Sequence, residues 1–135
     1  MNQSKLLVYS VFLTIISFAP PIFGQENTSQ NAIVTQYTHA INLYNNKAYA
    51  LAQKSFQDLI DSPSASYLKG NAAYYEAISS VKMNEPYAYK KVEAFVANYP
   101  TNSFKDQAYL VVGDYYFNNK QPAQSLRWYT LAEVN

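Results

Sequence analysis

The chain has 135 residues, of which 49% are hydrophobic, 16% are aromatic and only 14% are charged. It contains fourteen tyrosines, three glycines and no cysteine. This composition is too apolar and aromatic for a disordered chain, and too poor in glycine for a loop-rich β-sandwich. A formal charge of +1 lacks the positive footprint of proteins that bind nucleic acid. The absence of cysteine excludes disulfides, thiolate nucleophiles and cysteine-ligated zinc.

The first residues have the pattern of a secretory signal peptide. Lys5 gives a short positive start, an apolar run follows from residue 6 to residue 19, and Pro20 and Pro21 end it. A run of about 14 residues is too short for a ~30 Å hydrocarbon core and fits a signal-peptide core. We expect residues 1–24 to be cleaved after Gly24 and residues 25–30 to form a flexible polar lead-in. An uncleaved membrane anchor is the alternative.

Beyond residue 31, helical stretches alternate with turns that are marked by asparagine or proline. The sequence Asn-Asn-Lys at residues 45–47 recurs 73 residues later at 118–120, and Met-Asn-Glu at 83–85 lies midway. Spacings that are one or two multiples of about 36 residues indicate an array of helical repeats. Because glycine is scarce, we expect asparagine to adopt the left-handed conformation at these helix ends.

The apolar residues recur at helical spacing, and no segment keeps a period-two alternation, so the predicted fold class is all-α. Prolines and capping residues mark the ends of the segments. The six expected helices span about residues 31–45, 48–61, 65–83, 86–99, 103–118 and 121–134.

The last helix pair resembles the tetratricopeptide repeat family. Its large, small and aromatic residues follow the order of the family's pattern over about 27 residues: Tyr109, Gly113, Tyr116, Ser125, Tyr129 and Ala132. The second pair, with Ala73, Ala77 and Ser80, matches less completely, and so does the first, with Ile41 and Tyr44. The resemblance implies a right-handed superhelical array of three antiparallel helix pairs over residues 31–135. The repeats would span about residues 31–63, 65–100 and 103–135.

The family resemblance also implies a function. The first helix of each pair would line a concave groove that holds a peptide or helix of a partner protein. The stretch from Phe95 to Tyr129, with Tyr-Pro between its helices, is similar to exported family members of Gram-negative bacteria. We therefore expect a scaffold in the periplasm or at the outer membrane, with no transmembrane segment after signal cleavage. The groove residues that the resemblance implies are Thr38, Asn42, Asn45, Asn71, Tyr74, Ile78, Gln107, Leu110, Asp114 and Phe117.

Catalysis is not expected from this inventory of side chains. His39 is the only histidine, and no second metal ligand lies at helical spacing from it. The acidic residues are scattered, and no glycine-rich phosphate loop occurs. We expect no metal and no cofactor. The alternative function is a structural, N-terminal segment of a longer superhelical protein or of a homo-oligomer. Nutrient capture is a third hypothesis, disfavoured because a lipid-anchoring cysteine is missing.

Overall fold

The computed structural model describes residues 23–133, and the side chains of residues 28–132. The predicted core of the signal peptide lies outside these residues. The described part contains only helices, which confirms the all-α expectation. They are α1 (Phe23–Asn45), α2 (Tyr49–Asp61), the 3-10 helix η1 (Pro63–Leu68), α3 (Lys69–Lys82), α4 (Ala88–Asn98), α5 (Lys105–Asn118) and α6 (Pro122–Glu133).

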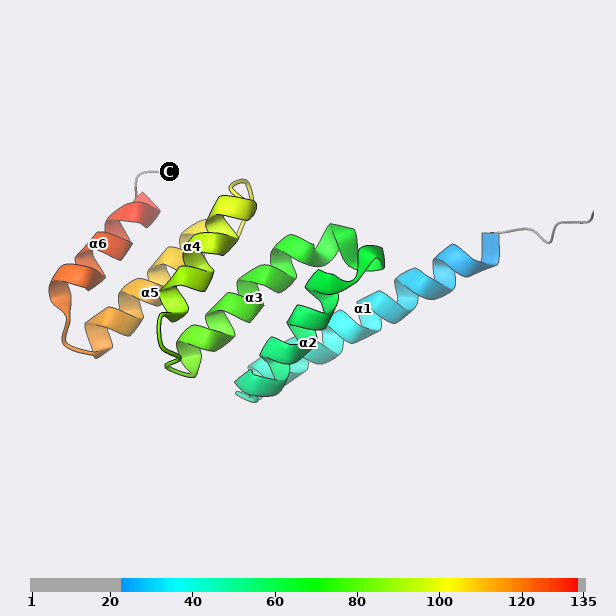
Figure 1. The fold of residues 1–135 in the computed structure, drawn as a ribbon, viewed down its shortest axis with the longest axis horizontal. Helices are drawn as coiled ribbons and strands as arrows, with labels where there is room; N and C mark the ends of the chain where they lie inside the picture. The colour runs from blue at the N-terminus through cyan, green and yellow to red at the C-terminus, as the bar shows by residue number, and fades with distance from the viewer. Residues whose placement is uncertain (1–22, 134–135) are drawn as a thin grey trace, which may run out of the picture.

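The helices form an elongated row in which the chain runs up and down (Figure 1). Each helix packs mainly against its neighbour in the sequence, and α3 also contacts α1 and α5. Contact between α4 and α5 is slight, whereas α5 and α6 pack closely together. Helix α3 therefore lies in the middle of the row, and it packs most extensively against α2.

Four helix starts differ from the prediction by two residues or more. Helix α3 begins at Lys69, after the 3-10 helix η1, rather than at residue 65, and α5 begins at Lys105 rather than at residue 103. Helix α1 begins at Phe23 and includes residues 25–30, which the sequence predicts as a flexible lead-in. No proline or glycine interrupts residues 25–45, so nothing stops the helix from extending to its N-terminal side. Helix α4 begins at Ala88 rather than at Pro86, because Tyr87 before it has a left-handed backbone with a φ of 59°.

Helices α1, α3 and α5 each end in a turn of the same type. Lys47, Asn84 and Lys120 have φ values of 60°, 63° and 58°, at spacings of 37 and 36 residues. In the first turn the amide of Ala48 donates to the carbonyl of Leu43 at 2.9 Å, and the other two turns repeat this bond. This Schellman arrangement satisfies carbonyls at the helix end. The turns recur at the spacing that the sequence predicts.

The prediction that asparagine takes the left-handed position is correct at Asn84 and wrong in the first and third turns. There lysine takes that position, and the asparagine lies one residue before it. In the third turn, the side-chain amide of Asn119 donates to the carbonyl of Tyr115 at 2.8 Å. Asparagine therefore serves this turn through its side chain, as a donor to a helix-end carbonyl.

Aromatic rings join the helices across the row. The ring of Tyr75 on α3 stacks against Phe56 of α2, with centroids 5.1 Å apart and planes 16° apart. The preceding residue, Tyr74, stacks against Phe104 just before α5, with centroids 4.5 Å apart and planes 14° apart. Neighbouring tyrosines of α3 thus point into the two halves of the row, and most of the ring contacts bury apolar surface between helices.

The last pair packs a glycine against a ring. Gly113 of α5 is buried, and a Cβ atom placed there would overlap the ring of Tyr129 on α6. The hydroxyl of Tyr129 donates to Asp114 Oδ1 at 2.7 Å, which fixes the ring over the glycine. At this contact only a hydrogen atom leaves enough room for the two helices to approach.

Candidate partner-binding surface

Seven of the ten predicted groove residues are exposed, on the first and fifth helices of the row. The exposed ones are Thr38, Asn42 and Asn45 on α1, and Gln107, Leu110, Asp114 and Phe117 on α5. The other three, Asn71, Tyr74 and Ile78, belong to α3 and lie between the two exposed groups along the row.

The prediction that Tyr74 and Ile78 line an open groove is wrong. Their exposed fractions are 6% and 0%. Tyr74 is covered by Phe104, and Asn71 is half-buried and accepts a hydrogen bond from Asn102 Nδ2 at 3.0 Å. Because α3 packs against helices on both sides, these positions of a middle pair face the next pair rather than solvent. The predicted set therefore does not make one continuous lining.

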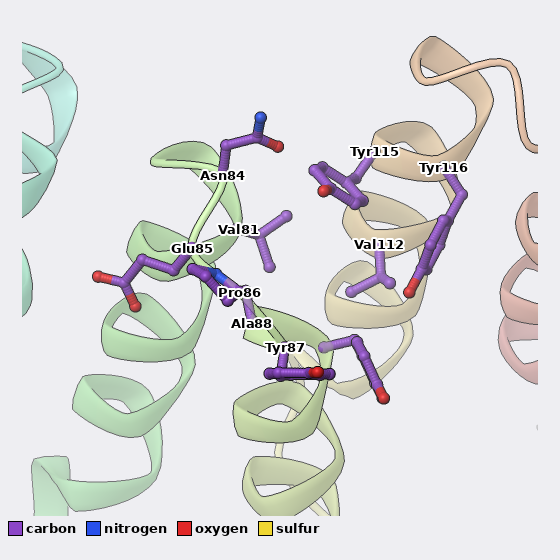
Figure 2. Close-up of a pocket in the computed structure, with 10 residues that line it drawn as sticks. Val81, Asn84, Glu85, Pro86, Tyr87, Ala88, Val112, Tyr115 and Tyr116 are labelled. Carbon is purple, nitrogen blue, oxygen red and sulfur yellow. The ribbon is translucent and has the colours of Figure 1, made fainter.

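The structure instead places a tyrosine-lined pocket where the α3–α4 turn meets α5. Its volume is about 130 Å³. Figure 2 shows Tyr115 and Tyr116 of α5 on one side, Tyr87 below, and Val81 and Val112 toward the centre. Tyr89 completes the ring-bearing part of the lining. An apolar cavity of about 150 Å³ is large enough for benzene, so this pocket has room for one side chain of that size.

The rim of this pocket has a strained and exposed aromatic residue. Tyr87 has a φ of 59° and is 69% exposed, and the ammonium of Lys90 lies 5.1 Å from its ring centroid. A bulky residue in the left-handed region costs about 1–3 kcal/mol, and such residues concentrate at ligand-binding sites. The exposed ring gains little from burial that would offset this cost, so Tyr87 is the leading candidate for a functional residue of the pocket.

One hydroxyl group in the pocket, that of Tyr116, has a raised pKa. Burial, followed by the nearby hydroxyl of Tyr89, raises the pKa of Tyr116 above its ordinary value of 10.0. The carboxylate of Glu85 belongs to the lining but points away from the centre in Figure 2. The pocket therefore presents rings, methyl groups and neutral donors, which suits a partly apolar side chain.

A second hollow, of about 300 Å³, lies beside the first. The two share Val81, Asn84 and Tyr115, and the second also includes Asp114. It contains one of the predicted groove residues and lies between α3 and α5. The pair of hollows extends from the turn at Asn84 along α5.

A polar cluster lies between α2 and α4. Lys91 Nζ is 2.6 Å from Glu76 Oε1 and 3.7 Å from Glu85 Oε2. Gln53 Nε2 donates to Ser80 Oγ at 2.6 Å and to Glu76 at 3.2 Å. These groups satisfy one another and join three helices, so we assign the cluster a structural role.

The part of the chain that the structure describes has no cluster of side chains that could ligate a metal ion. No three histidine, aspartate or glutamate side chains gather there in a way that holds an ion. His39 is exposed on α1. Over residues 23–133, no helix combines the length and apolar character that crossing a bilayer requires.

No family model, curated protein or solved structure matches the chain. The sequence predicts only part of this pocket. Tyr87 and Tyr89 are close in sequence and indicate an aromatic patch, but the left-handed backbone at Tyr87 has no glycine to mark it. Val81 and Val112 read as ordinary core residues.

Proposed function

We propose that this protein is an exported interaction scaffold of the tetratricopeptide repeat type, without catalytic activity. Three equivalent turns, sequential packing of helix pairs and the fit of Gly113 to Tyr129 support the repeat assignment. The partner is a protein segment of the cell envelope, and the helices form a right-handed superhelix. Binding is centred on the α3–α5 hollows instead of a groove through α3.

The tyrosine-lined pocket is the observation that carries this proposal. It receives one apolar or aromatic side chain of the partner as an anchor, while Tyr87 closes over it from the rim. Interfaces concentrate their binding energy on such anchors, and tyrosine is enriched in them. The exposed amides of α1 and α5 remain free to contact the partner's backbone on either side.

Affinity capture from an envelope extract tests this proposal. Tyr87→Ala removes the exposed ring, and the wild-type chain should retain a partner that the variant captures at least about tenfold less well. Tyr67→Ala is the matched control, because Tyr67 is 57% exposed on η1 and lines neither hollow. Circular dichroism checks that both variants fold. Equal capture of the same partners by Tyr87→Ala and the wild-type chain would refute the assignment of the pocket.

The second candidate function is a structural segment of a longer superhelix or of an oligomer. Phe117 and Leu126, at the α5–α6 end of the row, are 65% and 66% exposed. Large apolar side chains that are open to water favour a covered end in the working state. This second function does not require a ligand in the tyrosine-lined pocket.

A further inference from the structure

The tyrosine-lined pocket lies inside the described row rather than at its open end. Its walls are the last turn of α3, the α3–α4 turn and the C-terminal half of α5, and helices lie on both sides of it (Figure 1). The ring centroids of Tyr87 and Tyr89 are 6.4 Å apart with their planes at 65°, and those of Tyr115 and Tyr116 are 5.2 Å apart with their planes at 75°. The rings of each pair are thus steeply inclined, so the pocket has flat aromatic walls in several directions.

The polar groups of the lining can donate hydrogen bonds and have few partners of their own. The side-chain amide of Asn84 and the hydroxyl of Tyr115 bond to no other described residue. The hydroxyl of Tyr116 keeps its proton, because burial raises its pKa. Of the described residues that line the pocket, Glu85 alone is charged, and its carboxylate points away from the centre, 3.7 Å from Lys91 Nζ (Figure 2). A ligand that offers carbonyl oxygens beside an apolar ring would complement this lining.

A proline-rich segment in the polyproline II conformation has this chemistry. It makes no internal hydrogen bonds, so its carbonyl groups stay available, and each proline lacks a backbone N–H that would need an acceptor. An α-helix offers free carbonyls only in its last turn, and a β-strand brings as many donors as acceptors. The volume of about 130 Å³ suits a pyrrolidine ring, which is smaller than the benzene that a cavity of about 150 Å³ holds.

We propose that the partner binds through a proline-rich segment in the polyproline II conformation, with one proline ring seated among Tyr87, Tyr89 and Tyr116. This inference rests on the proposed function, because it identifies the anchor that the pocket receives. A pocket for one side chain offers little contact area to offset the cost of ordering a flexible peptide, and a polyproline II segment is already ordered. The residue three positions along lies on the same side of that segment and can enter the second hollow, which shares a wall with the first.

The chain's own proline pair does not fill the pocket. Pro20 and Pro21 precede the start of α1, at the end of the row that lies away from α5 and α6 (Figure 1). The two or three residues that separate them from Phe23 span at most about 11 Å, whereas α1 extends for about 34 Å from there to Asn45. The predicted cleavage after Gly24 would also remove them. The segment that binds therefore belongs to another molecule.

Titration of the full, ¹⁵N-labelled chain with decaproline tests the proposal. Amide shifts should change saturably at the α3–α4 turn and along the C-terminal half of α5. Tyr87→Ala should weaken this binding at least about tenfold, and Tyr67→Ala, which changes an exposed ring on η1, should not. Asn84→Gly keeps the left-handed backbone but removes the amide, so it should weaken binding about threefold. A glycine–serine decapeptide with one central phenylalanine should bind at least about tenfold more weakly than decaproline.

The other outcomes separate this inference from the proposed function. If decaproline causes no saturable shifts at the pocket, or if the phenylalanine peptide binds as tightly, the proline assignment is wrong. When Tyr87→Ala nevertheless loses its partner from the envelope extract, the pocket remains a binding site with a different anchor. Light scattering that shows a dimer, which Tyr87→Ala dissociates, also overturns the inference, because a second copy then fills the pocket. Melting curves check that each variant is folded.

Discussion

Replacing Gly113 by alanine should destabilise the protein, although the same change in most helices has the opposite effect. In a helix interior, alanine is favoured over glycine by about 1 kcal/mol. Here the added methyl group overlaps the ring of Tyr129, which must move. Overpacking of this kind costs about 1–3 kcal/mol. The displaced ring also loses its 2.7 Å hydrogen bond to Asp114, worth about 0.5–1.5 kcal/mol. We expect a net loss of about 1–2 kcal/mol of unfolding free energy.

Urea denaturation followed by circular dichroism measures this change. The decisive comparison repeats Gly113→Ala in a Tyr129→Ala background, where the methyl group meets no ring. There the substitution should stabilise the protein by up to about 1 kcal/mol, so its effect reverses sign. A stabilising Gly113→Ala in the otherwise unchanged chain would show that the helices separate at no cost, and would refute the close contact between α5 and α6.

Three further predictions address the turns, the polar cluster and the tyrosines. Lys120→Gly should raise the unfolding free energy by about 0.5–1 kcal/mol, because glycine adopts the left-handed conformation without strain, whereas Lys82→Gly at the last residue of α3, where the backbone is right-handed, should not raise it; thermal melting compares the two. Glu76→Ala should cost about 1–3 kcal/mol, since it removes the closest acceptor of Lys91 and one of the acceptors of the Gln53 amide, but Asp58→Ala, which breaks an exposed pair, should cost under about 0.5 kcal/mol in the same urea assay. Raised native pKa values mean that the tyrosines contribute stability below pH 10 and lose it as the pH rises from 10.0 toward the native values; absorbance at 295 nm should therefore titrate later in the folded chain than in urea, and coincident curves would contradict this. The tyrosines concerned are Tyr37, Tyr44, Tyr74, Tyr75, Tyr109, Tyr116 and Tyr129.

The helices and their period could be predicted from the sequence because the signals are local. The Asn-Asn-Lys repeats and the apolar spacing locate all six α-helices, with ends that differ by up to four residues except at the start of α1, which lies eight residues earlier than predicted. The backbone conformation at the turns was harder to predict from the sequence. Lys47, Tyr87 and Lys120 adopt a conformation for which their side chains have no preference, so neighbouring hydrogen bonds and packing decide it.

The candidate site was harder to predict, since it depends on which helix covers which face. The family pattern assigns Tyr74 and Ile78 to an open surface, yet the next helix pair buries both. Their counterparts Leu110 and Asp114 are exposed because α5 belongs to the last pair of the described row. Equivalent positions are therefore buried in the middle of the described row and exposed at its end. The residue types themselves do not reveal this difference.

The slight contact between α4 and α5 has a mechanical consequence. Helix α3 ties the first four helices together, because the ring of Tyr75 stacks on Phe56 of α2 and the ring of Tyr74 contacts Phe95 of α4. The last two helices adhere tightly to each other, but reach the rest mainly through α3. Under tension or mild denaturant, the row should part at this seam and release α5 and α6 as an intact hairpin, so amide hydrogens in α3 should exchange most slowly.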